Sequence, residues 1–320
     1  MGRYLARRVL VSIPVLLGIT LLTFLFINLA PGDPVSVLVD PDLAQRMPPE
    51  WFEAQRTRLG LDKPLLTRYL IWLDQLLHGN MGYSIASSRP VGNMIAERLW
   101  NTVSLMGLSL VVGLGLGLTV GIISAVKQYS WFDHFTTLFI FLMVSIPGFF
   151  KALILIFIFA LTLKWLPTSG MNTIGRGSTL WDSFKHLILP VSVISLGSAA
   201  EIARYMRASL LETIREDYIR AATGKGLSPS AILWRHAIPN AMIPVLTIAG
   251  LQLPSLFNGA VIAEQIFFWQ GIGLLSIRAV QGQDYPVLMG IILMSAFLVL
   301  ASNMLTDISY AIVDPRIRYS

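Results

Sequence analysis

The stretch 216–230, EDYIRAATGKGLSPS, is the part of the chain whose residue types come nearest to a chemical motif. Its Gly-Lys-Gly-Leu-Ser suggests a loop that cradles phosphate. Such a loop requires a glycine, four further residues and then Gly-Lys-Ser or Gly-Lys-Thr, placed between a strand and a helix. Here the first position of that pattern is Ile219, and the residue after Lys225 is Gly226. The spacing therefore argues against a phosphate-binding loop, and the segment needs another explanation.

The groups that carry catalysis or bind metals in other proteins are sparse in this sequence. There is no cysteine, which excludes disulfides, iron–sulfur clusters and cysteine-based zinc sites. The four histidines are His78, His134, His186 and His236. No pair has the spacing of metal ligands on one helix, although a site made of histidines alone stays open. Because no H-E-x-x-H, G-x-S-x-G or kinase-type motif occurs either, we predict a chain that is not an enzyme and binds no cofactor or metal itself.

The composition indicates an integral membrane protein. Hydrophobic residues make up 54% of the chain and charged residues only 13%, whereas a soluble domain has about 25% charged residues. The mean hydropathy is +0.66, so there is too little polar surface to cover a water-soluble globule. The net charge of +6 does not indicate nucleic acid. The basic residues lie at the ends of apolar runs, not in a patch interleaved with aromatic side chains.

Six apolar runs predict six transmembrane helices, and therefore an all-α integral membrane protein. The runs cover residues 9–30, 102–126, 134–164, 186–206, 240–263 and 286–312. The first run is too long for a signal peptide, so we interpret it as a retained helix. Basic residues gather before the first run (Arg3, Arg7 and Arg8), in 204–235, and at Arg316 and Arg318. They predict that this segment and both termini are cytoplasmic, which requires an even number of crossings. For the run 134–164 this parity favours one long helix kinked at Pro147 over two helices.

The spans divide the chain into three parts. Residues 1–30 hold the N-terminal cytoplasmic end and the first transmembrane helix. Residues 31–99 then lie outside as a partly helical external (periplasmic) subdomain, with helical patterning in YLIWLDQLL and turns marked by glycine and proline. Residues 100–320 form a five-helix core with a cytoplasmic loop at 207–239.

Within that loop, the sequence predicts a helix, a glycine turn and a second helix. Leu211, Ile214, Tyr218 and Ala222 recur at helical spacing. Gly224 and Gly226 follow, as a turn with positive φ requires. Ser228 is a suitable N-cap and Pro229 a suitable first helical residue, and Pro239 is expected to close the second helix. The small Ala221 and Ala222 would let another protein approach closely. The alternative is an ordinary loop between two spans.

The loop resembles the "EAA" loop of ABC-importer permeases, E-A-A-x3-G-x9-I-x-L-P. The matching residues are Arg220-Ala221-Ala222, Gly226 and His236-Ala237-Ile238-Pro239. Arg220 replaces the family's Glu and His236 its Ile, as in the branch for dipeptides, oligopeptides, glutathione and nickel (DppB/OppB-like). Four further segments resemble motifs of the same branch: APGDP at 30–34, LGLDKP at 59–64, DYP at 284–286 and DPRIR at 314–318. In FWQGIG at 268–273, Gln270 stands where the family has proline.

This resemblance implies the MetI-like ABC permease fold and a set of partners in the bacterial inner membrane. The partners are a second homologous permease, in a heterodimer, two ATPase subunits that carry ATP and Mg, a periplasmic or lipid-anchored substrate-binding protein, and membrane lipids, with no nucleic acid. The implied ATPase coupling residues are Arg220, Ala221, Ala222, Gly224, Lys225, Gly226, Leu227, His236 and Pro239. The implied cargo is a peptide, with glutathione or nickel as alternatives.

Three polar residues inside spans are candidates for the transport pathway or its gate. They are Glu264, Lys151 and Asn258, and Glu264 also resembles a family position near the external gate. An ionisable group within a span is by default a functional hypothesis. Gly113, Gly117 and Gly121 instead predict close helix packing, inside this chain or against the partner permease.

An ion-coupled secondary transporter is the alternative from a different class. It predicts two repeated halves, broken helices at matching positions and buried coupling charges. Six spans without an evident repeat, and a basic loop of the docking type, favour the importer. An intramembrane protease would need polar catalytic residues at mid-span, and none stands out in the sequence.

Overall fold

The computed structural model describes residues 2–29, 47–58, 62–175 and 179–313. The side chains of 2–6, 27, 251–259 and 305–313 lie outside that description. The described residues are mostly helical, and an isolated bridge joins Tyr83 and Pro90. The chain divides into two compact units, 1–100 with 274–300 and 101–273 with 301–320. Each unit is considered by itself.

The first unit contains the N-terminal helix and the segment that follows it. The helices are α1 (Gly2–Leu29), α3 (Pro49–Arg58) and α4 (Leu65–Leu77). The helical pattern read in the external segment is confirmed by α4, which packs on α1. Tyr69 shares a hydrogen bond of 2.9 Å with Thr20, and the rings of Tyr69 and Trp72 lie 5.5 and 5.8 Å from that of Phe24.

A buried aspartate connects the segment after α4 to the start of α13 (Tyr285–Val313). Asp284 accepts a hydrogen bond of 2.5 Å from Ser84 Oγ and one of 3.1 Å from the Ile85 amide. Asp284, the first residue of the DYP motif, therefore has a structural role: its carboxylate orders the turn before α5 (Val91–Val126).

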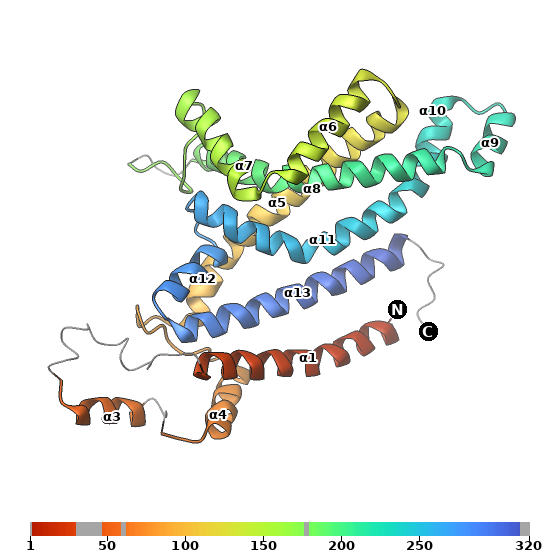
Figure 1. Ribbon diagram of the computed structural model, residues 1–320. Helices are drawn as coiled ribbons and strands as arrows, with labels where there is room; N and C mark the ends of the chain where they lie inside the picture. Colours follow the sequence, from red (N-terminus) through yellow and green to blue (C-terminus); the bar gives the residue numbers. More distant parts are fainter. Residues whose placement is uncertain (1, 30–46, 59–61, 176–178, 314–320) are drawn as a thin grey trace. The chain divides into compact units, whose positions relative to one another are not determined.

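The second unit is organised around α8 (Leu180–Thr213). α8 packs against α6 (Trp131–Ser145), α7 (Gly148–Leu155) and α11 (Ile238–Ile266), and Figure 1 shows α8 and α11 running side by side. The π-helical η2 (Ile156–Thr162) continues α7. Between α8 and α11 lie α9 (Asp217–Gly224), α10 (Pro229–Ile232) and the π-helical η3 (Leu233–Ala237).

The glycine repeat of α5 is the place where this helix meets α8. A Cβ on Gly117 would lie 2.7 Å from Ile202 Cβ, and one on Gly121 would lie 2.7 Å from the Ala203 carbonyl oxygen. Gly113 is equally tight against Ser198. The sequence predicted close packing either inside this chain or against a partner permease, and these glycines contact a helix of the same chain.

The described residues give four helical segments that are long and apolar enough to cross a membrane: Arg7–Phe26, Val91–Val126, Leu180–Thr213 and Tyr285–Met304. The pair Trp131–Ser145 and Gly148–Thr162 adds a fifth if it forms one span. α11 occupies the place of the remaining predicted span. Helices thus stand at all six predicted places, while the count of six crossings stays a prediction.

The expected kink at Pro147 was wrong, because the helix breaks there. The two halves are bent by 110°. Ile146 is extended (φ −79°, ψ 126°), and Pro147 precedes the first residue of α7. The proline ring disfavours the helical conformation at the residue before it, and here Ile146 is extended, so the helix ends at Ser145 and restarts at Gly148.

Candidate functional site: the segment between α8 and α11

The turn after α9 is a Schellman motif built on Gly226. The Gly226 amide donates to the Thr223 carbonyl (3.0 Å) and the Leu227 amide to the Ala222 carbonyl (3.4 Å). Gly226 has φ +79°, a left-handed conformation that favours glycine. The glycine turn expected from the sequence is therefore present, and this pair of hydrogen bonds is what makes Gly226 the critical glycine. Gly224 still belongs to α9.

α9 has one face in the protein core and one face in solvent. Ile219 is buried in a cluster with Leu210 of α8 and Ile238 of α11, and Ala222 is buried as well. Arg220, Ala221, Thr223, Gly224 and Lys225 are exposed. Of the two small residues expected to admit a partner, only Ala221 is accessible. Ala222 is instead buried, three residues after Ile219 on α9.

The second helix starts as expected but does not end where expected. Ser228 Oγ accepts from the Ala231 amide at 3.3 Å, and Pro229 is the first helical residue. The chain then continues through η3 into α11. Pro239 therefore does not end the second helix but lies in the first turn of α11. Proline is tolerated in a first helical turn, and the π-helical turn just before it changes the hydrogen-bond register. His236 is half-buried in η3.

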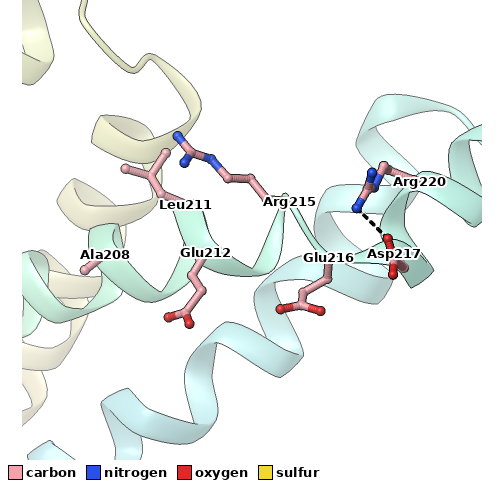
Figure 2. A pocket seen from close by; sticks show the side chains of 7 residues that line it. All are labelled: Ala208, Leu211, Glu212, Arg215, Glu216, Asp217 and Arg220. Atoms are coloured by element: carbon pink, nitrogen blue, oxygen red, sulfur yellow. Dashed lines mark hydrogen bonds and ion pairs between the residues drawn. The ribbon is translucent and has the colours of Figure 1, made fainter.

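A surface hollow of about 590 Å³ lies beside α9, at the end of α8 (Figure 2). It is lined by Ala208, Leu211, Glu212, Arg215, Glu216, Asp217 and Arg220. Arg220 and Asp217 form an ion pair whose side chains are 73% and 92% exposed. A pair this exposed adds little stability. A hollow with aliphatic side chains and charges of both signs suits a protein surface better than a small apolar ligand.

Next to this hollow, burial and the neighbouring Glu216 carboxylate raise the pKa of Tyr218. The phenol is 43% exposed, so the ring presents an apolar face and a polar end to the surface of α9.

Among the candidate pathway residues, Glu264 is fully buried. Its carboxylate accepts a hydrogen bond of 2.6 Å from Thr102 Oγ1, which itself accepts from the Ile272 amide at 2.8 Å. A Cβ on Gly271 would collide with the Glu264 carboxylate. In this structure Glu264 is an internal hydrogen-bond acceptor at the start of α12 (Ile272–Gln281), and its role at a gate stays a prediction.

The other two candidate pathway residues are Lys151 and Asn258. Lys151 lies in the first turns of α7, half-buried, and its Nζ donates to the Met143 carbonyl oxygen at 3.0 Å. Asn258 belongs to α11, but its side chain lies outside the described residues.

Sequence reasoning missed an ion pair at the beginning of the 207–239 loop. Arg207 Nε and Nη2 donate to the two carboxylate oxygens of Asp133, at 2.7 and 2.8 Å. Asp133 is 1% exposed and also accepts from Ser124 Oγ and the Tyr129 amide. Breaking a buried pair of this kind is strongly destabilising. The partners are 74 residues apart, so no local signal relates them.

The fold and this site define a membrane permease, and comparison with known families agrees. Residues 117–319 match the family "Binding-protein-dependent transport system inner membrane component". Residues 1–106 match the N-terminal model of such membrane components. The chain belongs to this family.

Curated relatives match over essentially the whole chain. It is similar to the oligopeptide transport system permease protein AppB of Bacillus subtilis (40% identity, 100% of both chains). It is also similar to a putative peptide permease protein of Brucella suis (41%, 99% of both) and to the dipeptide transport system permease protein DppB of Alkalihalophilus pseudofirmus (37%, 99% of both).

Solved structures agree on the fold. An inward-facing structure of the MetNI methionine ABC transporter superposes with a TM-score of 0.57 at 18% identity, covering 69% of this chain and 96% of that one. An amino acid ABC transporter superposes with a TM-score of 0.53 at 15% identity, covering 68% and 93%. At these identities the likeness concerns the fold alone.

Proposed function

We propose that this chain is the permease subunit of an ATP-driven importer for peptides and forms half of the translocation pathway. The observation that carries the proposal is the 40% identity over the full length of an oligopeptide permease. The exposed face of α9, held on a rigid turn, supports it from the structure. Glutathione and nickel remain the alternative cargoes.

The segment 217–238 is built to pass force into two long helices. Ile219 of α9, Leu210 of α8 and Ile238 of α11 share one buried cluster. Ser209 Oγ also donates to the Ala241 carbonyl at 2.9 Å, which connects α8 directly to α11. Displacing α9 therefore displaces the ends of both helices together, because packed side chains do not compress.

In the proposed mechanism, each of two ATPase subunits, which hold ATP and Mg, docks on a permease at the exposed face of α9. Arg220, Ala221 and Lys225 lie on this face, and the hollow beside α9 receives part of the ATPase surface. When the ATPases close on ATP, they favour the permease conformation that opens to the binding protein. A second, homologous permease completes the pathway. This arrangement places both termini and residues 207–239 in the cytoplasm.

The experiment that tests the proposal is purification of the tagged chain from its own membranes in mild detergent, followed by reconstitution into proteoliposomes. We expect a second permease, two ATPases and a binding protein to accompany the chain, and ATP to drive uptake of labelled peptides. Recovery of the chain alone, with uptake driven by an ion gradient and not by ATP, would instead establish a secondary transporter. Uptake of glutathione and of nickel is then measured in the same vesicles, and comparison with peptide uptake identifies the cargo.

A further inference from the structure

The break between α6 and α7 leaves carbonyls at the end of α6 without helical donors, and that of Met143 is one of them. In an α-helix the carbonyl of residue 143 bonds to the N–H of residue 147. Residue 147 is proline and has no N–H. Ile146 still donates to Leu142, which is the last such bond before the break. Met143 therefore offers an acceptor in an apolar setting, where an unsatisfied carbonyl is costly.

Lys151 supplies the missing donor from the far side of the break. Its Nζ reaches back across the bend and donates to the Met143 carbonyl oxygen at 3.0 Å. Ammonium groups inside spans are expensive, and pairing with a backbone carbonyl is one way in which they are accommodated. The sequence thus carries a proline that removes one hydrogen bond and, four residues later, a lysine that replaces it.

The same bond lies against α8. A Cβ on Gly197 of α8 would lie 3.5 Å from Lys151 Nζ, which places the ammonium beside this helix at ordinary contact distance. One turn further along α8, Ala200 and Ala203 pack with Ile140 and Met143 of α6. α8 is also the helix that ends beside α9. The bend is thus held at the surface of the helix that leads into the coupling segment.

We propose that Lys151 is a positioning residue that holds the α6–α7 helix pair at its bend, by donating to the Met143 carbonyl in place of the N–H that Pro147 lacks. The bend then depends on the side chain at position 151 only while position 147 is proline. With alanine at 147, the backbone N–H satisfies the same carbonyl and Lys151 becomes dispensable for the geometry. The inference concerns the shape of the span and does not depend on which cargo is carried.

The test is a double-mutant cycle on the intact transporter, read out as a distance. The chain has no native cysteine, so spin labels can be attached at Leu138→Cys on α6 and Leu153→Cys on α7. These side chains are 60% and 51% exposed. Pulsed electron–electron double resonance in proteoliposomes then measures the distance between the two labels, and this distance reports the bend angle between α6 and α7.

We expect Lys151→Met to shift and broaden this distance distribution when residue 147 is proline. Added to Pro147→Ala, the same substitution should leave the distribution of the single Pro147→Ala variant nearly unchanged. Assembly of Lys151→Met only when it is combined with Pro147→Ala would support the same conclusion. An unchanged distance in the proline background, an equal shift in both backgrounds, or failure to assemble in both would overturn the proposal.

Two further variants separate this bond from the charge alone. Lys151→Arg keeps an N–H donor and should retain the wild-type distance. Lys164→Met removes another lysine beyond the end of η2 and should leave the distance unchanged. ATP-driven peptide uptake by Lys151→Met should fall about tenfold, the population shift that follows from loss of one charge-assisted hydrogen bond. A loss of uptake with an unchanged label distance would mean that Lys151 acts in another way.

Discussion

The segment between α8 and α11 and the turn that joins α11 to α12 use charged side chains in opposite ways. In the first, Arg220 and Asp217 pair in solvent, and the shape of the segment is held by a backbone turn. In the second, Glu264 is fully buried, and the shape depends on its hydrogen bonds and on two glycines, Gly271 and Gly273.

The difference shows which region is available to a partner. An exposed pair can be exchanged for contacts with another protein at little cost, because water already satisfies both groups. A buried carboxylate that gives up its hydrogen bonds has no such replacement and resists rearrangement. Residues 217–226 are therefore suited to docking, whereas residues 264–273, with Asn101 and Thr102, form a rigid joint. Trp269 Nε1 donates to the Asn101 carbonyl at 3.0 Å and strengthens that joint.

The same glycine-to-alanine change in the two regions gives the largest predicted contrast. A Cβ on Gly273 would lie 2.6 Å from Val261 Cα, whereas one on Gly224 meets nothing within 4 Å. We expect Gly273→Ala to lower the stability of the purified complex by about 3 kcal/mol, since overpacking against backbone is not easily relieved. Gly224→Ala is the matched control and should leave the apparent Tm unchanged. Similar melting temperatures for the two variants would contradict the contrast.

A smaller effect is expected at Thr102, whose hydroxyl lies between Glu264 and the Ile272 amide. Thr102→Val keeps the shape of the side chain but leaves a buried carboxylate and a buried N–H short of one partner each. The cost should be about 2 kcal/mol, measured by thermal unfolding in detergent. Thr102→Ser retains the hydroxyl and should lose much less stability. Equal losses for valine and serine would show that packing of the methyl group dominates.

Gly226→Val changes the geometry of the turn in residues 217–238, the proposed coupling segment. Valine in the left-handed region is strained by about 1–2 kcal/mol, and the loss is confined to the Schellman turn. We expect the variant to reach the membrane with its overall stability nearly intact, but to show reduced ATP-coupled uptake and weaker ATPase binding in pull-downs. Gly226→Asn should retain more activity because asparagine tolerates this conformation. Normal uptake by the valine variant would refute the role of the turn in coupling.

The smallest effect on stability is expected for the exposed ion pair. Removing it through Arg220→Gln should change the stability by less than about 0.5 kcal/mol. Raising the ionic strength screens this pair. Because the pair contributes little to stability, the screening should leave the apparent Tm of the wild-type protein unchanged. A clear drop in Tm for Arg220→Gln, measured beside Asp217→Asn, would mean that the pair is structural and that the two regions differ less than described.

Much of the local structure of residues 217–238 could be predicted from sequence because its determinants are local. The positive φ of Gly226, the cap at Ser228 and the apolar spacing of α9 each involve residues within a few positions of one another. Prediction failed at the two prolines. The sequence predicts a helix end at Pro239, but a helical turn before it lets the chain continue into α11. It predicts a kink at Pro147, but the extended Ile146 makes it a break.

The sequence by itself determined the membrane class, the positions of six helical regions and the helix–turn–helix that resembles the coupling loop of importers. These follow from hydropathy and short-range hydrogen bonding, which depend on neighbours along the chain. Only the tertiary structure decided that Ala222 is buried while Ala221 is open, that Glu264 is an internal acceptor and that Asp133 pairs with Arg207. Those outcomes depend on which helix faces meet, and residues far apart in sequence leave no local pattern that records their contact.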